Sequence, residues 1–243
     1  MISVSIVHWY MAKNGWTFEL GNGVIPDIVN GAKLMHQFYT AADAQYSGRV
    51  TVPVLWDKKT STIVSNESSE IIRMFNSEFD GLGAQSGDYY PNALRPEIEA
   101  LNERIYATLN NGVYRCGFAT TQAAYEAAIT PLFETLDWLE SILAKNRYLT
   151  GPDITEADWR LFTTLIRFDP VYVGHFKCNL RRIVDYPNLF NYLRDLYQQP
   201  GIAETVNMQH IKEHYYASHD SINPSRVVPK GPNIDFYQPH NRA

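Results

Sequence analysis

Two short segments of the sequence carry the residue types from which a site for a peptide-like ligand can be built. The first is Val52-Pro53, which lies inside a β-rich stretch. If the bond before Pro53 is cis, Val52 presents its own N–H and C=O to a ligand instead of to a neighbouring strand. An ordinary trans proline at a sheet edge is the alternative, and the local sequence alone favours it because only about 5% of X–Pro bonds are cis.

Glu67-Ser68 is the second segment, and it lies where a β-rich pattern changes to a helical one. The N–H groups of a helix N-terminus, a hydroxyl and a carboxylate can together hold the carboxylate and the ammonium of an amino-acid-like ligand. An ordinary capped helix is the alternative and, for this segment taken alone, the better interpretation. The two segments together indicate a candidate site for an amino acid or a peptide.

Other reactive side chains give weaker indications. The two cysteines are Cys116 and Cys178, and Cys116 follows a tyrosine and an arginine that could lower the pKa of its thiol. A free cysteine is more often a small buried hydrophobe, which we expect for both. Without a Cys-x-x-Cys pair or clustered histidines, no metal site is predicted. The sequence has 16 tyrosines, so composition alone singles out none of them.

Composition and charge restrict the class of protein and its partners. The chain has 243 residues, 45% of them hydrophobic, and a formal net charge of −5. This length and this hydrophobic fraction are enough for one large or two small globular domains. No basic run is dense enough to neutralise a phosphate backbone, so we expect no nucleic-acid partner. No apolar run reaches about 18 residues and the start lacks a signal peptide, so we expect a soluble, cytoplasmic protein without a membrane partner.

The elements that must position these segments begin with a small α/β part. A β-branched run predicts a strand at Ile2–Val7, and two further β-rich stretches at 49–56 and 61–64 predict a hairpin. Pro53 inside the hairpin should lie at an edge or an irregular position, because proline cannot donate to a ladder. Helical patterns occur at 32–42, before the hairpin, and at 65–76, after it.

The remainder of the sequence is helical in pattern. Apolar stripes run through 98–109 and 128–143, and Pro131 inside the second stripe predicts a kink or a break there. Thr155 and Asp158 fit a capping box at the start of a helix that ends near Arg167, and Pro187 fits the first turn of another. The predicted organisation is an α/β domain at 1–80, an all-helical domain at 91–217 and an extended tail at 218–243.

Four longer stretches, at 48–57, 63–72, 111–118 and 167–178, carry a resemblance to a known family. They are similar to the glutathionyl-hydroquinone reductases, which are Xi-class relatives of the omega glutathione transferases. The resemblance runs from Ile2 to about Pro232 and implies a thioredoxin-like N-terminal domain followed by an all-helical C-terminal domain of the glutathione transferase type. It implies glutathione as co-substrate, quinone-derived small molecules as ligands, no metal and a homodimer.

The resemblance also implies roles for particular residues. Those that match family positions for glutathione are Trp16, Arg49, the backbone of Val52 before a cis Pro53, and Glu67 with Ser68 for the γ-glutamyl end. Tyr114 and Tyr215 match the tyrosines that line the hydroquinone side and are the catalytic candidates. The resemblance therefore makes the cis form of the Val52-Pro53 bond the expected one.

One family motif is missing from the sequence. The nucleophile of the family is a cysteine in a Cys-Pro-Trp-Ala-His-like motif at the start of the first helix, where the helix dipole stabilises a thiolate. No such motif occurs here, and Ile2–Val7 resembles the second strand of the family. We therefore expect a chain truncated before the catalytic cysteine, whose N-terminal domain is partial because its first strand and helix are missing.

The implied activity is the glutathione-dependent reduction of glutathionyl-hydroquinones to hydroquinones. Without the cysteine motif we expect little thiol transfer from these 243 residues alone. The alternative function is a non-catalytic module that binds glutathione or protein partners.

Overall fold

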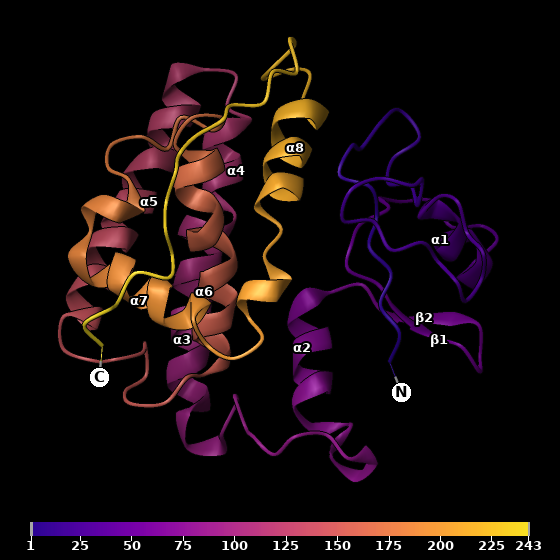
Figure 1. The fold of residues 1–243 in the computed structure, drawn as a ribbon, viewed down its shortest axis with the longest axis horizontal. Coiled ribbons are helices and arrows are strands. Elements are labelled where there is room, and N and C mark those ends of the chain that lie inside the picture. Colours follow the sequence, from indigo (N-terminus) through magenta and orange to yellow (C-terminus); the bar gives the residue numbers. More distant parts are fainter. Residues whose placement is uncertain (1, 243) are drawn as a thin grey trace. The chain divides into compact units, whose positions relative to one another are not determined.

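The computed structural model describes residues 2–242, and the chain divides into two units (Figure 1). The first unit comprises the chain as far as Ser86 together with Asn207–Ser218, and the second comprises Gly87–Val206 and the residues from His219 onward. The prediction placed residues 207–217 with the helical domain. Within the described range, no helix has the length and apolar character needed to cross a membrane.

The first unit is built on a β-hairpin and three helices. The antiparallel strands are β1 (Leu55–Asp57) and β2 (Thr62–Ser65), and the helices are α1 (His36–Ala42), α2 (Ser68–Ser77) and α8 (Met208–Ser218). The hairpin was predicted, although β1 is shorter than expected and begins after Pro53. The core of this unit consists of Phe18, Ala32, Met35, Phe38 and Tyr39.

Helix α8 belongs to the first unit because it is hydrogen-bonded to the N-terminal segment. The hydroxyl of Ser218 accepts from the N–H of Met11 at 3.0 Å and donates to the carbonyl of Trp9 at 3.3 Å. The Nδ1 of His214 lies 2.9 Å from the same carbonyl. These partners lie more than 200 residues apart in sequence, so local patterns could not have indicated this grouping.

The predicted strand at Ile2–Val7 is wrong. Only Ile6 pairs with another segment, through reciprocal backbone hydrogen bonds of 2.9 and 3.1 Å with Ile25. A strand needs a continuous ladder partner, and along residues 2–7 the described chain supplies a single bridge. High β-propensity therefore produces an extended segment here but no sheet strand.

The second unit is helical, as predicted. Its helices are α3 (Arg95–Ile105), α4 (Gly112–Gly117), α5 (Gln122–Leu143), α6 (Glu156–Arg167) and α7 (Pro187–Tyr197). Two π-helical turns, Tyr106–Asn110 and Phe168–Tyr172, follow α3 and α6, and short 3₁₀ turns lie at Asn92–Leu94, Ile183–Asp185 and Ala203–Thr205. Helix α5 runs unbroken through Pro131, so the expected break does not occur; the side chains around it, including Leu132 and Leu136, are fully buried.

The capping box predicted at Thr155 and Asp158 is confirmed at the start of α6. The Asp158 carboxylate accepts from the N–H of Thr155 at 2.8 Å and also from the N–H of Leu149 and the hydroxyl of Tyr192. Burial raises the pKa of Asp158, while these four donors, the Thr155 hydroxyl included, lower it. The cap therefore joins α6 to α7 as well as starting a helix.

The C-terminal tail packs against the helices of the second unit. Arg242 donates to the backbone carbonyls of Leu143, Asn146 and Arg147 at the end of α5. The amide of Gln198 donates to the carbonyl of Phe236 at 2.7 Å. The tail thus satisfies helix-terminal carbonyls that would otherwise need water.

Candidate functional site

The Val52-Pro53 segment lies in the first unit, and the bond between the two residues is cis, as predicted. The side chain of Val52 is exposed. Within residues 2–242, no hydrogen bond reaches the N–H or the C=O of Val52. The backbone of this residue is therefore available to pair with an extended ligand, in the manner of an added strand.

The second segment, Glu67-Ser68, forms the N-terminus of α2. Glu67 is the N-cap residue, and its N–H donates to the hydroxyl of Ser65 at 3.0 Å. That hydroxyl donates in turn to the Glu70 carboxylate at 2.7 Å, which fixes the first turn. Among the described residues, nothing accepts from the N–H groups of Ser68 and Ser69. Two helix-terminal donors, a hydroxyl and the exposed Glu67 carboxylate are thus presented together.

A buried tyrosine joins these two segments. The hydroxyl of Tyr39, on α1, donates to the carbonyl of Thr51 at 2.9 Å and accepts from the N–H of Thr51 at 3.1 Å. The side-chain amide of Asn66 donates to the same hydroxyl at 3.2 Å and to the Thr51 hydroxyl at 3.3 Å. Thr51 precedes Val52 and Asn66 precedes Glu67, so this hydrogen-bond cluster holds the two halves of the candidate site beside each other.

Trp16 also belongs to the first unit, where it is half-buried against α8. Its ring lies 4.7 Å from that of His214, between centroids, with an angle of 32° between the planes. The carbonyl of Trp16 accepts from the N–H of Met35, which ties its backbone to the segment before α1. Tyr215, the next residue on α8, is buried, and its ring lies 5.1 Å from that of His214.

Arg49 is exposed near the end of the loop that follows α1. Its carbonyl accepts from the hydroxyl of Tyr46 at 2.7 Å. Over residues 2–242, no acidic side chain forms an ion pair with the Arg49 guanidinium. The cation is therefore available for a carboxylate of a ligand, and the structure does not place it in the Tyr39 cluster.

Tyr114 lies in the second unit, on α4, and is part of an aromatic cluster. Its ring lies 5.4 Å from Phe176 and 6.2 Å from Tyr172, and those two rings are stacked at 5.5 Å with an interplanar angle of 7°.

Both cysteines also lie in this unit, and both are buried. No thiol is therefore available among the described residues of the first unit.

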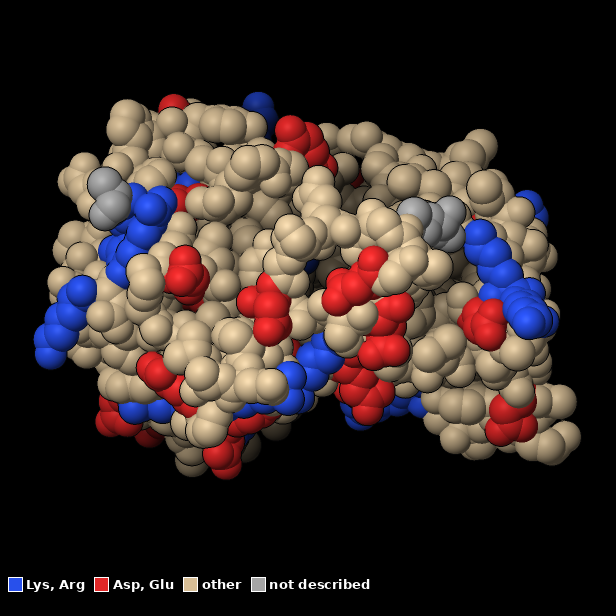
Figure 2. All heavy atoms as spheres, turned by 90° about the horizontal axis from the view of Figure 1, so that it is seen from below, with Lys and Arg blue, Asp and Glu red and all other residues tan. Residues whose placement is uncertain are grey.

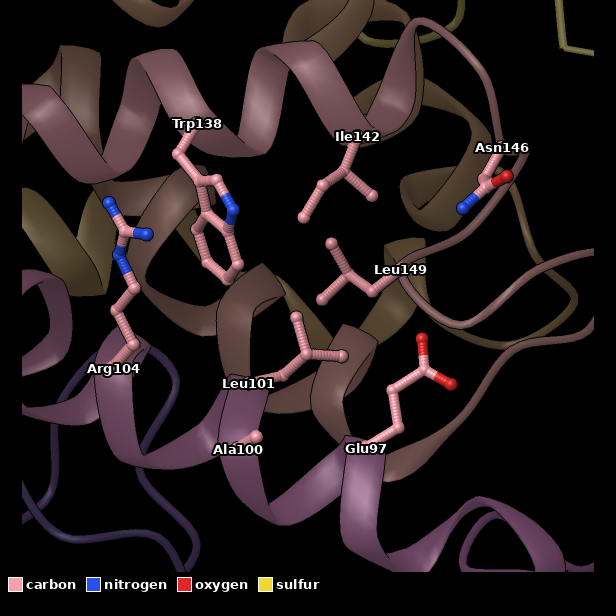
Figure 3. Close-up of a pocket in the computed structure, with 8 residues that line it drawn as sticks. All are labelled: Glu97, Ala100, Leu101, Arg104, Trp138, Ile142, Asn146 and Leu149. Atoms are coloured by element: carbon pink, nitrogen blue, oxygen red, sulfur yellow. The ribbon is translucent and has the colours of Figure 1, made fainter.

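A separate cavity of about 290 Å³ lies between α3, α5 and the loop after α5 (Figure 3). The guanidinium of Arg104 stands over the ring of Trp138 at 4.0 Å, at one end of an apolar floor that includes Leu101 and Ile142. None of the predicted site residues lines this cavity.

On the face of the molecule in Figure 2, acidic and basic side chains are interspersed.

Sequence reasoning missed the three residues of the hydrogen-bond cluster, Tyr39, Thr51 and Asn66. Thr51 and Asn66 flank the two predicted segments, so their positions were an available indication. Tyr39 could not be found in this way, because it lies 12 residues from Thr51 and 27 from Asn66. Nothing in its immediate sequence distinguishes it from the other tyrosines.

Comparisons with known proteins bear on the family of the chain. Residues 122–195 match the family model for the glutathione S-transferase C-terminal domain. The glutathionyl-hydroquinone reductase PcpF of Sphingobium chlorophenolicum is 60% identical over 232 residues, which are 96% of this chain and 74% of PcpF. The glutathionyl-hydroquinone reductase YqjG of Escherichia coli is 59% identical over 242 residues, which are 99% of this chain and 74% of YqjG.

Solved structures show the same similarity. The glutathione-bound structure of E. coli YqjG matches with a TM-score of 0.97 and 58% identity, over 98% of this chain and 78% of that one. The Xi-class glutathione transferase of Natrialba magadii also matches with a TM-score of 0.97, at 48% identity, over 99% of this chain and 74% of that one. The predicted fold class, a thioredoxin-like domain with a glutathione transferase helical domain, is confirmed.

Proposed function

Because this chain belongs to the glutathione transferases, and among them to the glutathionyl-hydroquinone reductases, we propose that it binds glutathione in its first unit and acts in the reduction of glutathionyl-hydroquinones. The family consists of enzymes, so the comparisons favour this function over a non-catalytic binding module. In the overall reaction, a glutathionyl-hydroquinone and one glutathione give the hydroquinone and glutathione disulfide. The thiol proton of glutathione goes to the hydroquinone carbon that loses sulfur, so atoms and electrons balance.

The observation that carries the proposal is the cluster around the Tyr39 hydroxyl. It holds an unpaired backbone, at Val52, beside an uncapped helix N-terminus, at Ser68. Glutathione is an extended peptide with a free α-carboxylate and an α-ammonium at its γ-glutamyl end. A strand-like backbone partner next to an anion-binding helix start suits these groups.

Each candidate residue then has a proposed part in binding. The Val52 N–H and C=O pair with the cysteinyl backbone of glutathione, and the Ser68 N–H and hydroxyl hold the γ-glutamyl carboxylate. The Glu67 carboxylate accepts from the α-ammonium, a charge-assisted contact. Arg49 and Trp16 take the remaining carboxylate and the face of the peptide.

For the tyrosines and the thiol chemistry, the proposal goes no further than the resemblance. Tyr114 and Tyr215 stay the catalytic candidates that the resemblance implies, each with a part in the departure of the hydroquinone. The 243 residues contain no Cys-Pro-Trp-Ala-His-like motif, so no residue of this chain is assigned as the nucleophile. A homodimer and a cytoplasmic location also stay predictions.

Glutathione titration calorimetry of a matched pair of variants tests the binding site. Glu67→Gln removes the proposed partner of the ammonium at the start of α2, whereas Glu78→Gln removes the same charge at the exposed C-terminal end of that helix. Loss of a hydrogen bond to a charged group costs about 1.5–3 kcal/mol, so Glu67→Gln should weaken glutathione binding roughly 10- to 100-fold. Glu78→Gln should leave the affinity within about twofold, and equal losses in the two variants would contradict the assignment.

A further inference from the structure

The indole ring of Trp16 rests against a histidine of helix α8. The ring centroids of Trp16 and His214 lie 4.7 Å apart, with an angle of 32° between the planes. Both side chains are half-buried, and both belong to the first unit. The proposed function assigns Trp16 to the face of glutathione and leaves His214 without a part.

The backbone around Trp16 leaves the direction of its side chain to tertiary contacts. Trp16 follows a turn in which the N–H of Gly15 donates to the carbonyl of Ala12 at 2.9 Å. The carbonyl of Trp16 accepts from the N–H of Met35 at 2.9 Å. These bonds fix the main chain, but a half-buried tryptophan can still turn about its two side-chain torsions. A flat neighbour against one face of the indole removes that freedom.

His214 is such a neighbour because its own ring is held in place. Its Nδ1 lies 2.9 Å from the carbonyl of Trp9, and a carbonyl can only accept, so Nδ1 carries a proton. The hydroxyl of Ser218, one turn later on α8, donates to the same carbonyl at 3.3 Å. The imidazole of His214 therefore keeps one orientation beside the indole of Trp16.

We propose that His214 is a positioning residue for glutathione, which supports one face of the Trp16 indole while the accessible part of that ring covers the bound peptide. His214 contacts no atom of the ligand and acts through Trp16. Because the indole is held in its ligand-binding orientation before glutathione arrives, less conformational entropy is lost on binding. The inference rests on the proposed function, since it deepens the part that Trp16 has there.

The ring of His214 and its hydrogen bond can be removed separately. A phenylalanine ring is only slightly larger than an imidazole, so His214→Phe keeps a flat face against Trp16. This variant loses the donor to the Trp9 carbonyl, which still accepts from Ser218. His214→Gln does the reverse, because glutamine has an N–H donor but no ring. The two variants therefore distinguish support of the indole from anchoring of the helix.

The test measures glutathione affinity by titration calorimetry in the wild-type chain and in these two variants. Binding is the readout rather than turnover, because the ring of Tyr215, a catalytic candidate, also lies 5.1 Å from that of His214. His214→Gln should weaken binding roughly 3- to 10-fold, which is the contribution of one aromatic ring pair. His214→Phe should stay within about twofold of wild type. Equal weakening in the two variants, or unchanged binding in His214→Gln, would overturn the proposal.

His210→Gln is the matched control on the same helix. His210 lies one turn before His214 and is also half-buried. Its side chain faces the turn at Gly23, where an added Cβ would lie 3.1 Å from its Nδ1. Glutathione affinity should be unchanged in this variant. A loss as large as that in His214→Gln would mean that any change on α8 disturbs the site, and would contradict a role through Trp16.

The indole N–H resonance of Trp16 gives a readout that general destabilisation would not move selectively. It should be sharp in the ligand-free wild-type and His214→Phe chains, and glutathione should shift it. In His214→Gln it should broaden or leave its wild-type position before any ligand is added. The indole resonances of Trp138 and Trp159, in the second unit, should stay unchanged in all variants. An unperturbed Trp16 resonance in His214→Gln would overturn the proposal.

A double-mutant cycle tests whether His214 acts through Trp16. In a Trp16→Ala background, His214→Gln should weaken glutathione binding by less than a further factor of about two, because the ring that it supports is gone. An equal loss in both backgrounds would contradict the proposal. The comparison of His214→Phe with His214→Gln decides it even where Trp16→Ala binds too weakly to measure.

The same measurements separate this inference from the function on which it rests. A wild-type chain that binds no glutathione would refute the proposed function and this inference with it. A wild-type chain that binds glutathione, with a His214→Gln variant that binds it equally well, would refute this inference alone.

Discussion

Replacing Tyr39 by phenylalanine removes one oxygen atom from the centre of the candidate glutathione site. The ring can stay in the core of the first unit, where Tyr39 is 3% exposed. The lost hydroxyl has four partners within hydrogen-bond distance: the N–H, the carbonyl and the hydroxyl of Thr51, and the amide of Asn66. Its one proton and two lone pairs can satisfy about three of them at a time. Tyr39→Phe therefore loosens the connection between the two binding segments without altering either segment.

The expected magnitude follows from these contacts. Each lost hydrogen bond contributes about 1 kcal/mol, so the free energy of unfolding should fall by about 2–3 kcal/mol. Thr51 is exposed, so water can replace part of the lost hydrogen bonding, and Asn66 keeps its bond to the Thr51 hydroxyl. We therefore expect the loss of unfolding free energy to lie near the lower end of this range, at about 2 kcal/mol. In the variant, glutathione must itself hold the two segments in place, which costs binding free energy. A cost of about 1.4 kcal/mol weakens glutathione binding about tenfold.

The assay combines urea unfolding with glutathione titration calorimetry. Tyr192→Phe is the matched control, because it removes a buried tyrosine hydroxyl in the second unit, 2.8 Å from the Asp158 carboxylate. Both variants should be destabilised to a similar extent, and only Tyr39→Phe should lose glutathione affinity. Equal affinity in the two variants would refute the view that the cluster organises the site.

Three further predictions concern the caps, the histidines and the thiol chemistry. Thr155→Ala should lower the free energy of unfolding by about 1 kcal/mol in a urea titration, and an unchanged midpoint would mean that the cap contributes little. Burial, together with the charge of His175 3.0 Å away, lowers the pKa of His219 from 6.5 to about 4. The unfolded chain then binds a proton that the folded chain does not, so stability should fall as the pH drops from about 6.5 to about 4, and His219→Gln should lose this component of the slope. The 243-residue chain should reduce a glutathionyl-hydroquinone at below roughly 1% of the rate of a version extended to include a Cys-Pro-Trp-Ala-His-like motif, and Cys116→Ala should leave the rate of the 243-residue chain unchanged. Comparable rates for the first two would show that this chain holds its own nucleophile.

Much of the fold was predictable where the pattern is local. The hairpin at β1 and β2, the capping box at Thr155 and the first-turn proline of α7 each depend on residues within a few positions of one another. The cis bond before Pro53 came from the family resemblance, because the local sequence favours the trans form.

The errors arise where distant contacts decide the structure. Ile2–Val7 has strand-forming residues but, among the described residues, only one bridging partner. The break that was one of the two expected outcomes at Pro131 does not occur in α5, whose side chains are buried on both sides of that residue. Helix α8 joins the first unit through hydrogen bonds to Trp9 and Met11. A pattern within one segment carries no information about such partners.

In the candidate site too, local patterns were predictable and contacts between distant residues were not. The residues proposed to face the ligand, Val52, Glu67 and Ser68, came from local chemistry and from resemblance. The residue that brings them together, Tyr39, was not predicted, because its role depends on which backbone groups its hydroxyl reaches in the folded chain. Residues that position a site are in general harder to predict than residues that contact a ligand.

The most direct test of the central claim is a titration of the isotope-labelled chain with glutathione, followed by its amide chemical shifts. The N–H groups of Val52, Ser68 and Ser69 have no acceptor among the described residues, so they should gain hydrogen bonds and shift most strongly. The amide chemical shifts of the residues that line the cavity between α3 and α5 should not change. Large shifts around that cavity, with Val52 and Ser68 unmoved, would contradict the assignment of glutathione to the first unit.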